Sequence, residues 1–345
     1  MDSFFASVEQ RDFPEFKGKA LVVGHRGPRS VVAAASYEAR KYGIYSAMPM
    51  SVALRKYPDL IVTPHRFDVY QEVSANIRHI FHEYTDLVEP LSLDEAYLDV
   101  TQAKKGPASA SLIAMEIKKE IQKREDLIAS AGVSYNKFLA KIASDMDKPD
   151  GFFLIEPAEA EGFLEDLDIA LFFGVGEKTA QKMHRMKIFK GRDLKSLPRE
   201  ELIKQFGKAG NYFYDVVRGI DNRPVVSFRE RKSIGAERTY ETDLYDINLV
   251  KEKLAEVLDI MWTRYEAKNK RGRTLTLKLR FSDFTTITRS STQNHDFSHE
   301  EMKTCIMNLL PQQEIKKRGV RLLGATMSNF QIDDQKSSKQ MKIDF

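Results

Sequence analysis

Two adjacent acids in the first third of the chain are the residues best suited to hold a metal ion. Asp94 and Glu95 lie where apolar runs on either side predict two strands around a tight turn, over residues 88–100. Neighbouring residues of a regular strand point to opposite faces, so both acids can reach one target only where the backbone turns or bulges. A divalent cation offsets their repulsion and is bound through one or two carboxylates plus substrate phosphates. On its own, an Asp-Glu pair more often belongs to a solvated turn than to a metal site. Neighbouring motifs are therefore needed to distinguish the two interpretations.

A second group of residues suits a phosphate-rich ligand. The alanine-rich stretch 36–41 predicts a short helix that ends at Tyr42-Gly43. Tyr37 and Arg40 stand on one face of that helix. Because a guanidinium fork and a phenol hydroxyl both bind phosphate oxygens, the pair suits a triphosphate.

The elements that must position these residues indicate several domains. The chain has 345 residues, which predicts about two to four domains. Up to Gly151, short strands alternate with helices, and this predicts a sheet covered by helices. The expected strands are 20–23, 30–35 and 128–133, and the expected helices are 68–84, 110–123 and 136–146.

The second half of the chain predicts two further domains. From Gly151 to Gly219 the pattern predicts helices only, with glycine-marked turns at 173–176 and 207–210. The polar segment 228–239 is predicted to be a linker. Beyond it, an antiparallel sheet backed by helices is expected, with helices at 249–265 and 300–310 and strands at 273–281 and 320–330.

Composition narrows the class of protein. Hydrophobic residues make up 42% and charged residues 30% of the chain, which excludes wholesale disorder. The single cysteine, Cys305, excludes an internal disulfide and a thiolate metal cluster and fits a reducing compartment. No apolar run approaches the ~20 residues that span a bilayer, and the opening segment carries acids where a signal peptide has basic residues. We therefore expect a cytoplasmic protein without a membrane partner.

The distribution of charge points to a polyanionic partner. The net charge is only +4, but two segments are strongly basic. Either segment alone is as readily a solvated face, whereas two of them favour a polyanion. The basic residues are Lys178, Lys182, Arg185, Lys187, Lys190 and Arg192 in one segment, and Arg264, Lys268, Lys270, Arg271, Arg273, Lys278 and Arg280 in the other.

Several motifs, taken in order, resemble the Y-family DNA polymerases and most nearly their bacterial DNA polymerase IV branch. The resemblance covers nearly the whole chain. It rests on Phe4-Phe5, on the segments 36–43 and 46–50, on Ser92-Leu93-Asp94-Glu95, and on Gly132-Val133-Ser134, Asn136-Lys137, Lys141 and Lys148-Pro149-Asp150-Gly151.

The resemblance implies an α+β multidomain protein with the right-hand polymerase fold. The expected parts are a palm (1–5 and 67–163), small fingers (6–66), a helical thumb with a helix-hairpin-helix (164–228), a linker (229–235), a C-terminal little-finger domain (236–332) and a tail that carries a clamp-binding peptide (333–345).

The implied activity is that of a DNA-directed DNA polymerase, which carries out template-directed, error-prone translesion synthesis without proofreading. The primer 3′-hydroxyl would attack the α-phosphate of a deoxynucleoside triphosphate in a reaction assisted by two Mg²⁺ ions. By this resemblance Asp94 ligates the metals and Glu95 helps to bind the one that lowers the hydroxyl's pKa. Tyr37, Arg40 and Lys148 would hold the triphosphate, and the Phe5 ring would exclude a ribose 2′-hydroxyl.

One departure from the family pattern concerns the metal site. The family has Asp-x-Asp before its paired aromatic residues, with the first Asp as a bridging metal ligand, whereas this chain begins Met1-Asp2-Ser3. Asp2 matches the second acid, so the bridging Asp is expected upstream of Met1, and a numbering that starts at an internal methionine is the favoured explanation. If that Asp is truly absent, the alternative is a non-catalytic DNA- and clamp-binding protein. A metal nuclease with a helix-hairpin-helix shares the carboxylates but leaves Tyr37, Arg40 and Phe5 unexplained.

The implied partners are primer-template DNA, deoxynucleoside triphosphates and the sliding clamp, with the protein itself a monomer. Gly174, Gly176 and Lys178 resemble a helix-hairpin-helix, whose backbone amides approach a phosphate without reading bases. Arg271 and Arg273 would grip DNA from the little finger. The polar tail ends in a run that resembles a clamp-docking peptide, with Gln340, Ile343 and Phe345 on the matching positions and Met341 where leucine is commoner.

Overall fold

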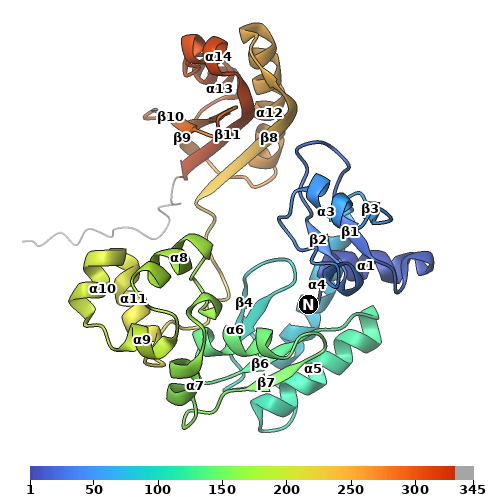
Figure 1. Ribbon diagram of the computed structural model, residues 1–345. Coiled ribbons are helices and arrows are strands. Elements are labelled where there is room, and N and C mark those ends of the chain that lie inside the picture. Colours follow the sequence, from blue (N-terminus) through green and yellow to red (C-terminus); the bar gives the residue numbers. More distant parts are fainter. Residues whose placement is uncertain (331–345) are drawn as a thin grey trace, which may run out of the picture. The chain divides into compact units, whose positions relative to one another are not determined.

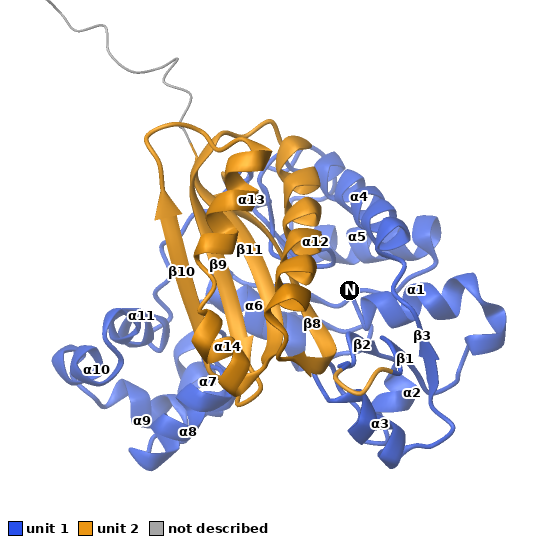
Figure 2. Ribbon diagram, turned by 90° about the horizontal axis from the view of Figure 1, so that it is seen from above, with its two compact units in different colours: residues 1–26, 30–229 blue, residues 27–29, 230–345 orange. Residues whose placement is uncertain are grey.

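The computed structural model describes residues 1–330 and divides into two compact units. The first unit contains residues 1–26 and 30–229, and the second contains residues 27–29 and those from 230 onward (Figures 1 and 2). None of the helices found in this part of the chain is long and apolar enough to cross a membrane.

The first unit begins with a small sheet and the helices around it. Strand β1 (Leu21–Val23) lies in the middle, antiparallel to β2 (Ala34–Ala35) and parallel to β3 (Ile61–Thr63). The helices are α1 (Phe4–Asp12), η1 (Pro14–Phe16), α2 (Tyr37–Arg40) and α3 (Met50–Lys56). The Ser36 hydroxyl accepts a hydrogen bond from the Ala39 amide, and this cap fixes the start of α2.

Two long helices follow and supply much of the apolar core beneath the site. In α4 (Phe67–Tyr84) the buried residues recur at helical spacing, and the same holds for α5 (Ala110–Glu125). The predicted helices at 68–84 and 110–123 are therefore confirmed. The residues concerned are Tyr70, Val73, Ile77, Ile80 and Tyr84 in α4, and Ile113, Ile117 and Ile121 in α5.

The predicted single sheet under these helices is instead two separate ladders. Strand β4 (Val88–Pro90) pairs antiparallel with β5 (Ala96–Leu98), and β6 (Ala131–Val133) pairs parallel with β7 (Phe152–Leu154). No strand within residues 1–330 joins the ladders, and a groove of about 1020 Å³ is lined by β5, α5, β6 and α6 (Lys137–Met146). The prediction of helices only beyond Gly151 is wrong at its start, because β7 occupies that position.

Close packing holds α6 against β6. A Cβ atom on Gly132 would lie 2.1 Å from the Ser144 amide nitrogen, so only glycine permits this approach. Two side chains cap the helix N-terminus: the Asn136 side chain accepts from the Leu139 amide, and Asp221 accepts from the Phe138 amide.

The remainder of the first unit is helical and shares a core with α6. Its elements are α7 (Ala160–Asp166), η2 (Ile169–Leu171), α8 (Glu177–Arg185), α9 (Gly191–Lys195), α10 (Arg199–Phe206) and α11 (Lys208–Val216). The Phe138 ring of α6 packs against Phe172, with centroids 5.7 Å apart. Gly174 has a φ of +94°, which a side chain disfavours, so this glycine permits the turn before α8.

The second unit is a four-stranded antiparallel sheet with helices on one face (Figure 2). The strand order is β10 (Thr286–Thr292), β9 (Gly272–Phe281), β11 (Val320–Phe330), β8 (Ser233–Leu244). The helices are α12 (Ile247–Glu266), α13 (His299–Asn308) and α14 (Gln312–Arg318). Strand β9 alternates buried leucines with half-exposed polar residues, as its sequence predicts. Strand β8 begins at Ser233, inside the segment predicted to be a linker.

Candidate active site

The hairpin of β4 and β5 places Asp94 and Glu95 side by side. The Glu95 carbonyl oxygen accepts from the Leu91 amide at 2.9 Å, which closes the turn. The Ser92 hydroxyl donates to Asp94 Oδ1 at 2.8 Å and so orients that carboxylate. The side chains of Asp94 and Glu95 are 28% and 36% exposed, so both remain open to a ligand.

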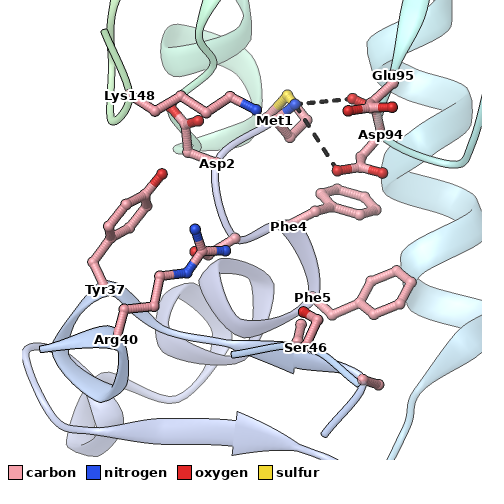
Figure 3. Close-up of a pocket in the computed structure, with 13 residues that line it drawn as sticks. Met1, Asp2, Phe4, Phe5, Tyr37, Arg40, Ser46, Asp94, Glu95 and Lys148 are labelled. Atoms are coloured by element: carbon pink, nitrogen blue, oxygen red, sulfur yellow. Dashed lines mark hydrogen bonds and ion pairs between the residues drawn. The ribbon is translucent and has the colours of Figure 1, made fainter. Parts of the chain in front are cut away.

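These acids border a pocket of about 250 Å³ whose walls come from four separate stretches of the chain. Tyr37 and Arg40 reach in from the side opposite Asp94 and Glu95, and Lys148 extends over the top (Figure 3). The lining residues are Met1, Asp2, Ser3, Phe4, Phe5, Ala33, Ala34, Tyr37, Arg40, Ser46, Asp94, Glu95 and Lys148. The structure therefore brings together all the residues predicted for metal, triphosphate and sugar.

Tyr37 and Arg40 hold one another in position from helix α2. The Arg40 guanidinium lies 4.8 Å from the centre of the Tyr37 ring, and its Nε donates to the Ala35 carbonyl at 3.2 Å. Within residues 1–330 the Tyr37 hydroxyl, which is buried and directed into the pocket, makes no hydrogen bond of good geometry, although Asp2 lies near it. Burial, with a smaller contribution from the negative charge of Asp2, raises the pKa of this phenol, so the hydroxyl remains a donor at neutral pH.

Lys148 belongs to a chain of charged contacts that reaches Glu95. Its Nζ lies 2.7 Å from Asp145 Oδ1, and the other oxygen of that carboxylate accepts from Lys141 Nζ at 2.8 Å. Lys141 Nζ also lies 3.2 Å from Glu95 Oε1. Burial alone would lower the pKa of Lys141, but the two carboxylates raise it, so this lysine is charged.

Asp2 is buried and hydrogen-bonded within the protein. It is 1% exposed, and its carboxylate accepts from the Ser130 hydroxyl and, at 2.8 Å, from the Asp150 amide. The Asp2 amide donates to the Ile128 carbonyl, while the Met1 amine donates to the Asp94 carbonyl. These contacts give Asp2 a structural role between the start of the chain and the segments at 128–130 and 150, and that Asp2 is not a metal ligand stays a prediction.

Phe5 lies on the floor of the pocket within an aromatic cluster. Its ring stacks on Tyr70 of α4, with centroids 4.3 Å apart and planes 14° from parallel, and meets the edge of Phe67. Tyr70 is fully buried, and its hydroxyl donates to Glu9 Oε1 at 2.6 Å. The position of Phe5 is thus set by side chains that sequence analysis did not single out.

The donor set at the hairpin fits a divalent cation. Asp94 and Glu95 supply hard carboxylate oxygens to one pocket, and phosphates of a bound substrate would complete the coordination. No group of three or more His, Cys, Asp or Glu residues with metal-binding geometry is found within residues 1–330.

The residues predicted to bind DNA that the structure describes are not among those that line this pocket. Gly176 caps α8, and Lys178 is exposed on the first turn of that helix. Two members of this basic segment are engaged within the protein, because Lys182 donates to the Gln205 carbonyl and Arg192 pairs with Asp166. Arg271 and Arg273 flank the start of β9 in the second unit. Gln340, Ile343 and Phe345 lie outside the described residues.

Sequence analysis gave no role to three residues that the structure places at or beside the site. Ser46 lines the pocket, and Lys141 and Asp145 form the charged chain behind it. The spacing of Lys141 and Asp145 was a usable signal, because residues four apart are neighbours on a helix, whereas Lys148 lies beyond the end of α6.

Family models match most of the chain. A model described as the impB/mucB/samB family matches residues 1–145, and the model of that family's C-terminal domain matches residues 231–343. Between them, a model described as the thumb domain of DNA polymerase-iota matches residues 173–221.

Individual proteins match over nearly the full length. The chain is 51% identical over 330 residues to a DNA polymerase IV of Bacteroides fragilis (strain YCH46), covering 95% of this chain and 91% of that protein. It is 49% identical over 341 residues to DNA polymerase IV 2 of Agrobacterium fabrum, covering 99% of this chain and 96% of that protein. Among solved structures, a Y-family DNA polymerase chimera of Dbh and Dpo4 matches with a TM-score of 0.88 at 32% identity, covering 96% of this chain and 98% of that chain.

Proposed function

The chain belongs to the Y-family of DNA polymerases, in the DNA polymerase IV branch, and from this premise we propose that it extends primers by error-prone, lesion-tolerant synthesis without proofreading. The membership makes it a DNA-directed DNA polymerase, and the expected α+β right-hand fold is confirmed. The observation that carries the proposal is the pocket in which Asp94 and Glu95 face Tyr37, Arg40 and Lys148 (Figure 3).

The residues of this pocket have complementary tasks toward a deoxynucleoside triphosphate. Arg40 would offer its planar guanidinium and Lys148 its ammonium charge to the phosphate oxygens, and the Tyr37 hydroxyl, which makes no hydrogen bond of good geometry within residues 1–330, would donate to one of them. Phe5 lies on the floor, where its ring would collide with a 2′-hydroxyl. Positioning and charge neutralisation supply most of the rate in such phosphoryl transfers.

Asp94 and Glu95 would hold divalent cations, and we propose two Mg²⁺ ions. Bound there, the metal supplies Lewis-acid stabilisation of the phosphates and lowers the pKa of the primer 3′-hydroxyl. The role of the two acids is to fix its place: Ser92 orients Asp94, and Lys141 holds one oxygen of Glu95.

The partners proposed are primer-template DNA, deoxynucleotides and a sliding clamp. Solved structures of the relative Dbh include an insertion ternary complex, which supports the first two. We assign the grip on the DNA backbone to Gly174, Gly176, Lys178, Arg271 and Arg273, and the clamp contact to residues 340–345. The domain boundaries given above, a monomeric state and a cytoplasmic location complete the proposal.

The small residues of the proposed fingers fit a polymerase that tolerates distorted base pairs. Ala33 and Ala34 line the pocket with methyl groups alone, so they would leave room beside the nascent base pair for a distorted base. The alternative of a non-catalytic DNA- and clamp-binding protein is not favoured, because the chain's relatives are named polymerases.

Replacing Asp94 by alanine tests the proposal. We expect primer extension to fall by several orders of magnitude while DNA affinity stays within about twofold, because contacts elsewhere hold the backbone. Asp86→Ala, at the far end of the same hairpin, is the matched control, since the Asp86 side chain is 80% exposed and its ion pair within residues 1–330 is with Lys104. Extension by Asp94→Ala at a near wild-type rate would refute the assignment.

A further inference from the structure

Behind the pocket, one carboxylate joins its metal-binding side to its triphosphate-binding side. Asp145, on the last turn of α6, accepts from Lys141 with one oxygen and lies 2.7 Å from Lys148 Nζ with the other. Lys141 in turn contacts Glu95 at 3.2 Å. The four residues therefore form an unbroken chain, Glu95–Lys141–Asp145–Lys148, with alternating charge.

We propose that Asp145 is a positioning residue that holds the Lys148 ammonium at the place where the triphosphate binds. This inference rests on the proposed function, since it takes Lys148 as a triphosphate ligand.

Lys148 needs such support because of where it lies. Helix α6 ends at Met146, so Lys148 stands on the loop beyond it, and its side chain has four rotatable methylenes. Asp145 ties the ammonium back to the helix across a spacing of three residues. An ammonium that is already held loses less conformational freedom when a ligand binds, and affinity rises accordingly.

Asp145 could instead compete with the triphosphate for Lys148, and two features argue against this. An ammonium has three donors, and Asp145 uses one of them, so two remain for phosphate oxygens. The negative charge of Asp145 is also balanced by Lys141, whose side chain is only 13% exposed. The triphosphate therefore meets a carboxylate that is already neutralised.

The test is a double-mutant cycle between Asp145 and Lys148 in the full chain. The affinity of a deoxynucleoside triphosphate is measured at equilibrium on primer-template DNA with a dideoxy-terminated primer, so that no chemistry contributes. We expect Asp145→Asn to weaken binding about three- to tenfold. In the Lys148→Ala background the same substitution should change affinity by less than about twofold, because the ammonium that it positions is gone.

Asp147→Asn is the matched control, because Asp147 is exposed and adjoins Lys148 in sequence, whereas the ion pair found for Lys148 within residues 1–330 is with Asp145. It should bind the nucleotide like the wild type. Thermal unfolding of both variants monitors the fold, and Asp145, with a side chain 52% exposed, should tolerate the amide.

Three outcomes would overturn the inference. The first is an unchanged affinity in Asp145→Asn, the second is tighter binding, which would make Asp145 a competitor, and the third is an equal loss with and without Lys148. If Lys148→Ala itself binds nucleotide normally, the assignment of Lys148 under the proposed function fails and the inference fails with it. A weakened Lys148→Ala beside a normal Asp145→Asn refutes the inference alone.

Discussion

Replacing Phe5 by alanine separates a sugar-discriminating ring from an ordinary packed one. The ring stacks on the buried Tyr70 at 4.3 Å and is flanked by Phe67, so it cannot retreat from a larger ligand without disturbing α4. Forcing an extra atom into packed space costs about 1–3 kcal/mol. Since about 1.4 kcal/mol corresponds to a tenfold rate ratio, removing the ring should raise the use of ribonucleotides relative to deoxynucleotides by about fivefold to about 150-fold.

The assay is single-nucleotide primer extension, with the specificity constant measured for a ribonucleotide and for its deoxy counterpart. Phe67→Ala is the matched control, because Phe67 meets the edge of Phe5 but does not line the pocket. It should loosen the aromatic cluster without opening space at the sugar, so its discrimination should stay within about threefold of the wild type. An unchanged ratio in Phe5→Ala, or an equal change in both variants, would refute the assignment of Phe5.

Three further predictions concern acid stability, DNA binding and the tail. Burial alone would raise the pKa of Asp221, but hydrogen bonds from Arg223 hold this pKa below its usual value. The stability that the Asp221 carboxylate contributes is therefore present above about pH 4 and is lost as the pH falls through the lowered pKa. Thermal unfolding of Asp221→Asn should therefore depend less on pH than that of the wild type between about pH 5 and pH 3. Replacing Arg271 and Arg273 together by alanine should make the slope of log affinity for duplex DNA against log salt concentration shallower by about 1.8, if each neutralises one phosphate. An unchanged slope would show that the two arginines are solvated and do not contact DNA phosphates. Deletion of residues 340–345 should abolish clamp-stimulated synthesis and leave synthesis without the clamp unchanged, and a truncated protein that binds the clamp as tightly as the full chain would contradict this.

The local pattern of the sequence determined the longer elements and the residue types of the site. Apolar spacing was enough for α4, α5 and α12, because one buried face on a helix of four or more turns leaves a strong periodic signal. Alternation likewise located β9, and the apolar run at the end of the domain gave β11. The hairpin that carries Asp94 and Glu95 followed from two apolar runs around a turn.

Tertiary structure decided what those residues touch. Strand β7 has three residues and pairs with β6 across about twenty positions, so its local pattern is too short to distinguish it from a helix. The pocket gathers side chains from positions 1–5, 33–46, 94–95 and 148, and only folding brings them together. The stacking of Phe5 on Tyr70 and the two lysine contacts of Asp145 depend on rotamers that packing selects. Sequence thus supplied the chemical groups, and packing fixed their distances, because contacts between remote segments leave no periodic trace in the chain.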